Sequence, residues 1–248
     1  MLTTKETANF FWHGNPPSLY EINCLLSFVK NDFNVNLWTF TKFDVPTGIN
    51  ICDAREFFNQ DDILKFKQDE KVGCLAAFSD AFRYHVLNKY QGWWFDTDCV
   101  CLTDQSNFKK LKENRKIVAG YEDDTHINGA VLSFNDAKLS IQSLQMLNAT
   151  LDECSYNIKW GGIGPQLITK LVNTNDLRDS ILPPSFFYPV SYKHALDALD
   201  PNKLEDIETM CSQSYVYHCW NEVLTRKQVN KNIMPTHNSF LFKKFSNQ

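Results

Sequence analysis

Two aspartates, Asp96 and Asp98, stand one residue apart directly after the apolar run Trp93-Trp94-Phe95, and they form the one Asp-x-Asp in the chain. Carboxylates are less expected after such a run than at an ordinary surface turn. If the backbone turns there, both side chains can reach one site. Hard cations such as Mn²⁺ or Mg²⁺ prefer carboxylate oxygen and keep positions open for phosphate oxygens and water. A cation at this pair would neutralise the charge that grows on a departing diphosphate.

A second polar group lies on the helix expected just before this motif. Spacing of i, i+3 and i+4 places Asp80, Arg83 and Tyr84 on one helical face. In a helix with a purely structural role, such a face would be either apolar and buried or exposed to solvent. An Asp/Arg pair directed at the pocket of the two aspartates could instead hold sugar hydroxyls and phosphate.

These residues must be positioned by the strands and helices around them. The expected order of these elements predicts a single α/β domain over residues 1–248, with one Rossmann-like mixed sheet flanked by helices. Asp96 ends a strand, and α/β sheets bind ligands beyond the carboxyl ends of their strands. Residues 41–72 are expected to be polar and irregular apart from one helical turn near Ile63, and residues 230–248 to form a polar tail with little periodicity. The expected strands cover residues 9–14, 35–40, 93–95, 99–102, 116–121, 129–134 and 215–218, and the expected helices cover residues 18–30, 73–90, 139–151 and 165–172.

Composition restricts the partners of the chain. Its net charge is -4 and it has no long Lys/Arg run, which disfavours nucleic-acid binding. No stretch reaches the roughly 18–20 apolar residues that span a bilayer, and the N-terminus lacks the pattern of a signal peptide. The eight cysteines show no Cys-x-x-Cys spacing, which argues against a structural zinc site and for reduced, buried thiols. We therefore expect a cytoplasmic protein with no transmembrane segment.

The polar residues of the helix and the motif form a longer signature that resembles glycosyltransferase family 32, which includes the Gb3 synthase-like α-1,4-galactosyltransferases. The signature is Ser79-Asp80-x-x-Arg83-Tyr84-x-x-Leu87-x-x-Tyr90-x-Gly92-x-x-x-Asp96-x-Asp98. Further matches extend the resemblance from residue 11 to residue 221: Phe11-Trp12-His13-Gly14, Asn128-Gly129-Ala130, Gly164-Pro165-Gln166-Leu167-x-Thr169, Phe187-Tyr188-Pro189 and His218-Cys219-Trp220-Asn221. The resemblance implies a GT-A fold and a retaining sugar transfer from a nucleotide-diphosphate donor.

The resemblance also implies roles for the matching residues. Trp12 is expected to stack on the base, and Asp98 to ligate Mn²⁺ or Mg²⁺ directly. Asp96 is expected to contact ribose or sugar and to join the metal set through water, and His218 to be a further ligand beside the diphosphate. The catalytic set is expected to be Asp80, Arg83, Asp96 and Asp98. Donor binding is expected from Trp12, His13, Asp80, Arg83, Tyr84, Trp94, Asp96, Asn128 and Gly129. The acceptor side is expected to be lined by Gly162, Gln166, Trp220 and Asn221.

The chain departs from the family pattern just before the motif. The family usually has Gly-Gly-x-Tyr there, whereas this chain has Gln91-Gly92-Trp93-Trp94. Trp94 keeps an aromatic ring but lacks the hydroxyl, so its role stays open, and the bulk of Trp93 is expected to narrow the pocket. The acidic Glu122-Asp123-Asp124 is expected in a solvated loop between two strands.

The expected donor is a UDP-sugar that carries a hexose or an N-acetylhexosamine, with a GDP-sugar as an alternative. The acceptor is a glycan, a lipid-linked saccharide or a protein side chain, and the sequence does not choose among them. The expected absence of a membrane anchor favours a bacterial or viral setting with a cytosol-facing acceptor, and a peripheral membrane location also fits.

Two other classes stay open at the level of sequence. Asp96-Thr97-Asp98-Cys99-Val100 also resembles the motif of haloacid-dehalogenase-type phosphatases, with Asp96 as nucleophile and Asp98 as acid, although that fold normally starts with this strand and here 95 residues precede it. The other class is a non-catalytic nucleotide-sugar-binding domain. The intact charged residues Asp80 and Arg83 argue against it, because drift usually removes charges that have lost their task.

Overall fold

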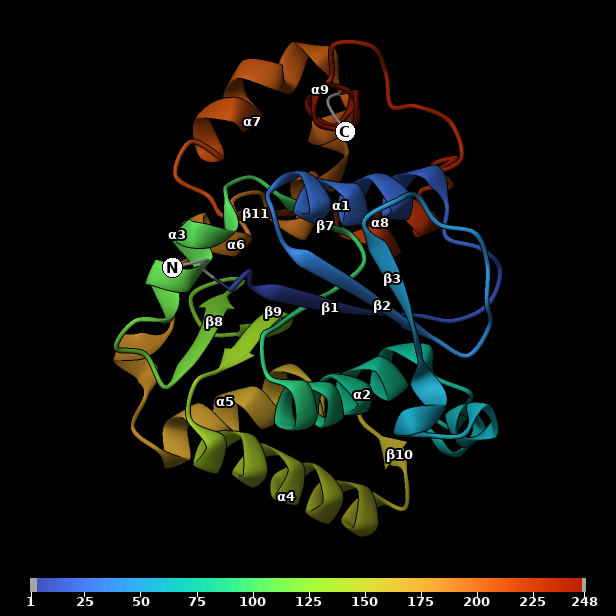
Figure 1. Cartoon of the computed structure of the whole chain (residues 1–248), viewed down its shortest axis with the longest axis vertical. Helices are drawn as coiled ribbons and strands as arrows, with labels where there is room; N and C mark the ends of the chain where they lie inside the picture. Colours follow the sequence, from blue (N-terminus) through green and yellow to red (C-terminus); the bar gives the residue numbers. More distant parts are fainter. Residues whose placement is uncertain (1–3, 247–248) are drawn as a thin grey trace.

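The computed structural model describes residues 4–246, and its centre is a six-stranded mixed sheet in the order β3-β2-β1-β6-β9-β8 (Figure 1). β1, β2, β3 and β6 run parallel, whereas β9 is antiparallel to both of its neighbours. The strands are β1 Thr7–Trp12, β2 Asn34–Thr39, β3 Ile49–Asp53, β6 Trp93–Phe95, β8 Ile117–Tyr121 and β9 Ile127–Phe134. The predicted α/β class with one mixed sheet is confirmed.

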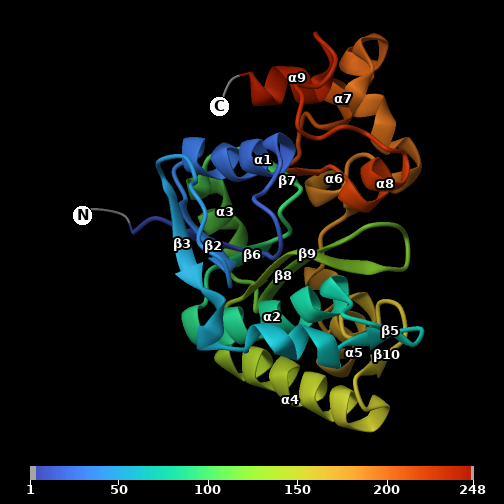
Figure 2. The same ribbon diagram turned by 90° about the vertical axis from the view of Figure 1, so that its right-hand side faces the viewer.

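Helices cover both faces of this sheet (Figures 1 and 2). One face is covered by α1 Leu19–Lys30 and α3 Gln105–Lys112, and the other by α2 Leu75–Tyr90, α4 Ala137–Cys154 and α5 Pro165–Thr174. Successive residues of a strand point to opposite faces, so each buried strand supplies both layers. In β1, Phe10 packs on Phe28 of α1 with ring centroids 5.1 Å apart, and Phe11 packs on Phe82 of α2 at 4.7 Å.

A two-stranded antiparallel sheet joins the C-terminal half of the chain to the segment that follows Asp98. β7 Cys99–Cys101 pairs with β11 Val216–His218, and the register places His218 opposite Cys99. Residues that follow Asp98 directly are thereby held against residues 115 to 119 positions later in the chain. The other elements of this half are α6 Pro184–Phe187, α7 Leu204–Met210, α8 Asn221–Arg226, α9 Phe240–Phe245 and the 3-10 helices Arg178–Ser180, Tyr192–Leu199 and Pro201–Lys203.

Residues 41–72 contain more structure than the sequence predicts. β3 lies in this segment at the edge of the sheet, and only its first residue, Ile49, is buried, so the strand shows no clear alternation. The helical turn near Ile63 is confirmed as the 3-10 helix Gln60–Lys65. A three-stranded sheet joins this segment to a later one, with strands β4 Lys67–Gln68, β5 Lys71–Val72 and β10 Asn157–Ile158; Ala54–Glu56 is a further 3-10 helix.

The expectation of a polar tail with little structure after Asn230 is wrong for its last part. α9 places Phe240, Leu241 and Phe245 in a core cluster with Tyr20 and Cys24 of α1, and each of these three side chains is at most 4% exposed. The helix is only six residues long, which is too short for a helical period to show in the sequence. Figures 1 and 2 show α9 beside α1.

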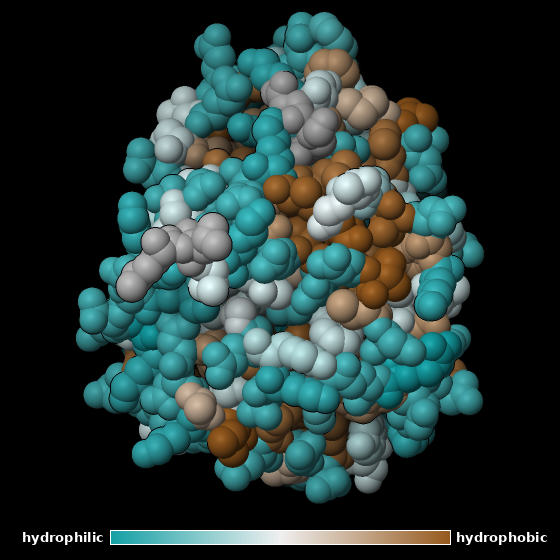
Figure 3. All heavy atoms as spheres, viewed as in Figure 1, coloured by the Kyte–Doolittle hydropathy of each residue, from teal (hydrophilic) through white to brown (hydrophobic). Residues whose placement is uncertain are grey.

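Apolar side chains also reach the surface over α1 and β3, where Figure 3 shows a brown area. Leu26, Val29 and Ile51 from these two elements are partly buried and pack on the core beneath. Within residues 4–246, none of the helices has both the length and the apolar character to cross a membrane.

Candidate active site

The predicted site lies where the strand order reverses. From β1 the chain first adds β2 and β3 on one side of the sheet and then crosses to add β6 on the other side of β1. Ligands of α/β sheets bind beyond the carboxyl ends of the strands at such a point. A hollow of about 480 Å³ opens there. Its walls include residues that follow β1 and β6 together with the end of β11: Trp12, His13, Trp94, Asp96, Thr97, Asp98, His218, Trp220 and Asn221.

Asp98 and His218 form a buried pair at this hollow. Oδ1 of Asp98 lies 3.2 Å from Nε2 of His218, and Oδ2 accepts a hydrogen bond of 2.7 Å from the backbone N–H of Asn221. Burial opposes ionisation of Asp98, but His218 and the Asn221 N–H outweigh it and hold the pKa of the carboxyl below its usual range. Burial likewise opposes protonation of His218, yet the attraction of Asp98 raises the pKa of the imidazole.

These residues fit a hard divalent cation. Ligand atoms of Asp98, Cys99 and His218 all lie within 4.8 Å of one another, and the carboxylate and the imidazole both line the hollow. Cys99 is a poor member of this set, since its thiol contacts the Ala130 carbonyl at 3.8 Å and burial raises its pKa far above the usual value. A protonated thiol does not ligate a hard ion, so the set reduces to one carboxylate and one imidazole.

Asp96 contacts a different set of protein groups from Asp98, and all of them bind one of its two carboxylate oxygens. Oδ1 of Asp96 accepts from Nη2 of Arg83 at 3.1 Å and from the indole N–H of Trp94 at 2.8 Å. Asp96 also falls outside the group of side chains that could share one ion. The prediction that Asp96 contacts ribose or sugar, and the metal only through water, stays a prediction that fits this geometry. Trp94, whose role the sequence left open, orients Asp96.

Arg83 is the centre of this second cluster. Its side chain is 4% exposed, and Nη2 lies 2.9 Å from Oδ1 of Asp80 as well as 3.1 Å from Asp96. The guanidinium carbon lies 5.5 Å from the centroid of the Trp94 ring. Burial raises the pKa of Asp80 to about 6, an effect that Arg83 opposes and Asp96 reinforces. One buried cation thus holds two carboxylates at the wall of the pocket.

A second hollow of about 170 Å³ adjoins the first and shares Asp96 and Ala76 with it. Asp80, Arg83 and Gly129 line this smaller cavity. Glycine is required where backbone and side chains approach closely: a Cβ at Gly129 would overlap the guanidinium of Arg83, and one at Gly164 would overlap the carboxylate of Asp80. Asn128, Gly162, Ile163 and Trp160 complete the wall of this cavity.

The amide of Asn128 is fixed on both sides. Its Oδ1 accepts from the Ala130 N–H at 2.7 Å, and its Nδ2 donates to Glu122 at 2.6 Å. Glu122, which the sequence placed in a solvated loop, therefore positions a predicted donor contact. Asp123 and His126 of the same loop are exposed and pair with each other at 2.9 Å.

A network that the sequence did not reveal supports Asp98 from behind. Asn221, whose N–H binds Asp98, donates its side-chain amide to Glu21 at 2.8 Å. Lys231 donates to Glu21 at 2.7 Å and to Oδ1 of Asn221 at 2.8 Å. Glu21 is 1% exposed. The capping box at Ser18 is visible in the sequence and accounts for a glutamate at position 21, but nothing links that position to residue 231.

Four predicted residues lie elsewhere than expected. Tyr84 is fully buried in the core between α2 and its neighbours and lines neither hollow, so the predicted donor contact is corrected: its ring extends inward from the shared helical face. Trp220 and Asn221 line the larger hollow with Asp98 rather than a separate acceptor side. Gln166, also expected on the acceptor side, is exposed, and its amide donates to the carbonyl of Trp160 at 3.1 Å.

The backbone of Trp220, which lies beside the Asp98–His218 pair, is strained. Its φ is +56°, a left-handed conformation that a bulky residue rarely adopts. Its indole N–H donates to the Val190 carbonyl at 2.7 Å, and its ring lies 4.3 Å from that of His218. The strained residue thus packs directly on a predicted metal ligand.

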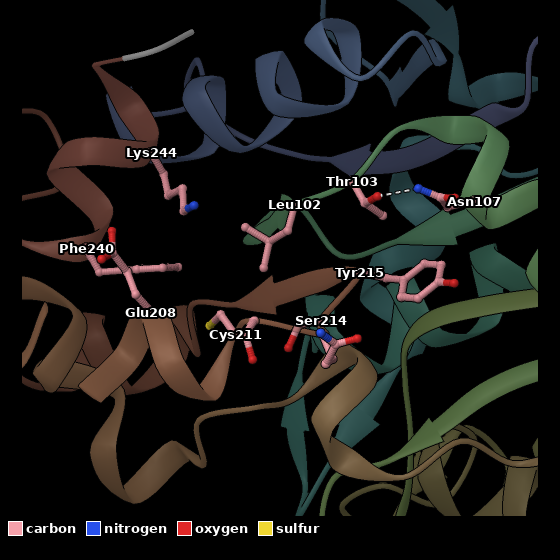
Figure 4. Close-up of a pocket in the computed structure, with 11 residues that line it drawn as sticks. Leu102, Thr103, Asn107, Glu208, Cys211, Ser214, Tyr215, Phe240 and Lys244 are labelled. Atoms are coloured by element: carbon pink, nitrogen blue, oxygen red, sulfur yellow. Dashed lines mark hydrogen bonds between the residues drawn. The ribbon is translucent and has the colours of Figure 1, made fainter. Parts of the chain in front are cut away.

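Another hollow, of about 500 Å³, lies between β7, α7 and α9 (Figure 4). Leu102, Cys211 and Phe240 are on its wall, and the hydrogen bond from Asn107 to Thr103 measures 2.6 Å. None of the predicted site residues lines it, and Glu208 is the one carboxylate among its lining residues. We therefore assign the chemistry to the hollow at Asp96 and Asp98.

Solved structures define the class of this fold. The chain is similar to a structure described as PaToxG Glycosyltransferase, with a TM-score of 0.51, 12% identity, and coverage of 98% of this chain and 87% of the other. It is also similar to apo glycosyltransferase GlyE from Streptococcus pneumoniae TIGR4, with a TM-score of 0.51, 13% identity, and coverage of 87% and 54%. The predicted GT-A fold is confirmed.

Sequence comparison adds a resemblance to one family. Residues 145–241 match the family model of the alpha 1,4-glycosyltransferase conserved region. Lactosylceramide 4-alpha-galactosyltransferase of Rattus norvegicus is 27% identical over 160 residues, and that of Homo sapiens is 28% identical over 159 residues. These matches cover 60% of this chain but only 41% and 42% of the relatives. The predicted resemblance to the α-1,4-galactosyltransferase group is confirmed.

Proposed function

We propose that this protein is a metal-dependent, retaining glycosyltransferase that moves a hexose or N-acetylhexosamine from a nucleotide-diphosphate sugar to an acceptor hydroxyl. One observation carries the proposal. A pair suited to a cation, Asp98 and His218, and a pair suited to sugar hydroxyls, Asp80 and Arg83, lie on two hollows that meet at Asp96. A nucleotide sugar has the same division, with a diphosphate at one end and a polyhydroxylated ring at the other.

Asp98 and His218 would hold Mn²⁺ or Mg²⁺, and Asp96 would contact ribose or sugar. When bound, the ion supplies positive charge that stabilises the leaving diphosphate. Asn221 and the Glu21–Lys231 pair hold the Asp98 carboxylate in one orientation, and its low pKa keeps it ionised at neutral pH. Supporting groups of this type usually raise metal affinity.

The Arg83 cluster would orient the sugar. The guanidinium is fixed by two carboxylates, so its remaining N–H groups and the free carboxylate oxygens present a rigid set of donors and acceptors. Asn128, held by Glu122, adds an amide to the lining of the same cavity. The bond from the anomeric carbon to the phosphate breaks, a bond to the acceptor oxygen forms on the same face, and the acceptor proton passes to the departing diphosphate. This route uses no covalent nucleophile of the protein.

Trp12 and His13 line the larger hollow at the end of β1, where the base of the nucleotide would stack. The indole N–H of Trp12 donates to the Asn15 carbonyl at 2.6 Å, which holds the ring in place. We propose a UDP-sugar as donor, with UDP-galactose first, because the relatives named above are galactosyltransferases. The cytoplasmic location stays a prediction.

The test is donor hydrolysis and transfer by the purified chain with a panel of UDP- and GDP-sugars, with Mn²⁺ or with EDTA. We expect Mn²⁺-dependent release of nucleotide diphosphate from one donor, and stabilisation of the protein against heat by that donor with Mn²⁺. At a ligand concentration of 100 Kd the gain is about 2.7 kcal/mol. No hydrolysis or transfer from any donor, with stabilisation retained, would favour the non-catalytic binding domain instead.

The structure favours the transferase over the phosphatase alternative. Oδ1 of Asp96, the nucleophile that a phosphatase would require, accepts hydrogen bonds from Arg83 and Trp94. The strand before it, β6, is central to a sheet of the GT-A type rather than the first strand of its domain.

A further inference from the structure

An exposed tryptophan stands at the edge of the smaller hollow. Trp160 is 68% exposed, which is the largest exposed fraction among the large apolar residues described as exposed. It lines the cavity of about 170 Å³ together with Asp80, Arg83 and Asn128. A single exposed apolar side chain is common on protein surfaces, but this one lies at a cavity that is lined by charged and amide side chains. An aromatic ring beside such groups is suited to bind a ligand that has both an apolar face and hydroxyl groups.

The segment that carries Trp160 is firmly built. It connects β10 to α5, and the Gly162 N–H donates to the Lys159 carbonyl at 2.9 Å in a tight turn. Gly161 adopts φ +71°, and the side chain of Gln166 holds the carbonyl of Trp160 at 3.1 Å. Pro165 begins α5 immediately afterwards. The exposure of the ring therefore does not come from an unanchored backbone.

We propose that Trp160 is the platform on which the terminal sugar ring of the acceptor stacks, so that the acceptor is a saccharide rather than a protein side chain. A pyranose has one face of C–H groups that packs on an aromatic ring, while its hydroxyls point outward to polar partners. A ring on Trp160 would present a hydroxyl to the hollow where Asp80 and Arg83 are placed to hold the donor sugar. This inference rests on the proposed function and names the acceptor class of the same site.

The test separates donor chemistry from acceptor binding. Donor hydrolysis without acceptor, and transfer to a series of mono- and disaccharides including lactose, are measured for the full chain and for Trp160→Ala, Trp160→Phe and Ile141→Ala. Ile141 is 50% exposed on α4, lines neither hollow, and serves as the matched control. We expect Trp160→Ala to raise the acceptor KM by about tenfold or more and to change the rate and donor KM of hydrolysis by a much smaller factor, while Ile141→Ala changes none of these quantities. Trp160→Phe should restore most of the loss.

An acceptor KM unchanged in Trp160→Ala, with hydrolysis intact, would overturn the proposal. So would an equal fall in hydrolysis and transfer, because Trp160 would then act on the donor or on the fold. Binding of lactose to the wild type and to Trp160→Ala by saturation-transfer NMR gives a readout without catalysis. If the wild type hydrolyses no donor, the proposed function fails; a saccharide contact that Trp160→Ala abolishes would still support the platform, and its absence would remove it.

Discussion

Arg83 and its two carboxylate partners form a charged cluster around a buried guanidinium group. A cation that is 4% exposed is held between Asp80 and Asp96, and the whole cluster depends on glycines at positions 129 and 164. Buried ion pairs often contribute less to stability than well-packed apolar groups would. Such a cluster in a pocket wall is more readily explained by ligand binding than by folding.

Asp80→Asn tests this at the level of the residue. Because burial raises the pKa of Asp80 to about 6 from 3.8, the folded protein binds this proton more tightly than the unfolded chain does. The stabilising contribution of the group is therefore full below about pH 4 and is lost as the pH rises to about 6. Asparagine does not ionise, so we expect the variant to be more stable than the wild type at pH 8 by roughly 1–3 kcal/mol, and donor hydrolysis to fall about 100-fold.

Urea unfolding at several pH values between 4 and 8 provides the measurement. The gain in stability should grow across this range for Asp80→Asn and be absent for the exposed Asp124→Asn. A difference between Asp80→Asn and the wild type that does not change with pH would show that the carboxyl does not titrate as stated.

Among the elements, α1 and the segment after α8 meet next to Asp98 and His218. Glu21 in the first turn of α1 is 1% exposed and contacts Lys231 and Asn221, and the backbone of Asn221 holds Asp98. Through these contacts, α1 and the segment after α8 together hold the carboxylate of Asp98 in place. Burial opposes ionisation of Glu21, but the bonds from Lys231, Ser18 and Asn221 outweigh it and lower its pKa.

Lys231→Met would leave Glu21 buried without its cation. We expect a loss of about 3–5 kcal/mol in the free energy of unfolding at neutral pH. The Mn²⁺ concentration for half-maximal activity should rise by about tenfold or more, because Asn221 loses one of the two groups that fix it. Adding Glu21→Gln should recover part of the stability. Lys227→Met, at an exposed lysine on the same segment, is the control; an equal effect of both variants on the Mn²⁺ requirement would exclude the network from the site.

Across the whole molecule, the two ends of the chain share one core. α9 packs Phe240, Leu241 and Phe245 onto Tyr20 and Cys24 of α1. The C-terminal helix is therefore part of the fold rather than a tail.

Leu241→Ala tests this packing. Leu241 is fully buried, so removing most of its side chain should lower the free energy of unfolding by about 2–5 kcal/mol. Ile233→Ala, at a residue that is 60% exposed, should change it by less than about 0.5 kcal/mol. Chemical denaturation of both variants decides the matter. Equal stabilities would mean that α9 contributes nothing to the core.

The sequence predicts the central part of this molecule better than its periphery. Ser18, the run before Asp96 and the end of α2 at Gln91 carry local signals, so the first helix, β6 and α2 lie close to their predicted bounds. β3 has one buried residue and α9 has six residues in all, so neither leaves a detectable period.

The residues of the site also fall into those that the sequence predicts and those that it does not. Asp80, Arg83, Asp96 and Asp98 are near in sequence and share a motif, and the structure brings them together. Glu21, Lys231 and Glu122 act through contacts between distant or loop positions, which no local pattern encodes. Tyr84 shows the converse, since a shared helical face does not decide where a long side chain ends.

Binding of Mn²⁺ in the presence of UDP, measured by calorimetry or by the Mn²⁺ electron paramagnetic resonance signal, tests the central claim most directly. We expect one ion per chain in the wild type and a loss of affinity of about 100-fold or more in Asp98→Asn, with Asp124→Asn unchanged. Equal Mn²⁺ affinity in the wild type and Asp98→Asn would contradict the account.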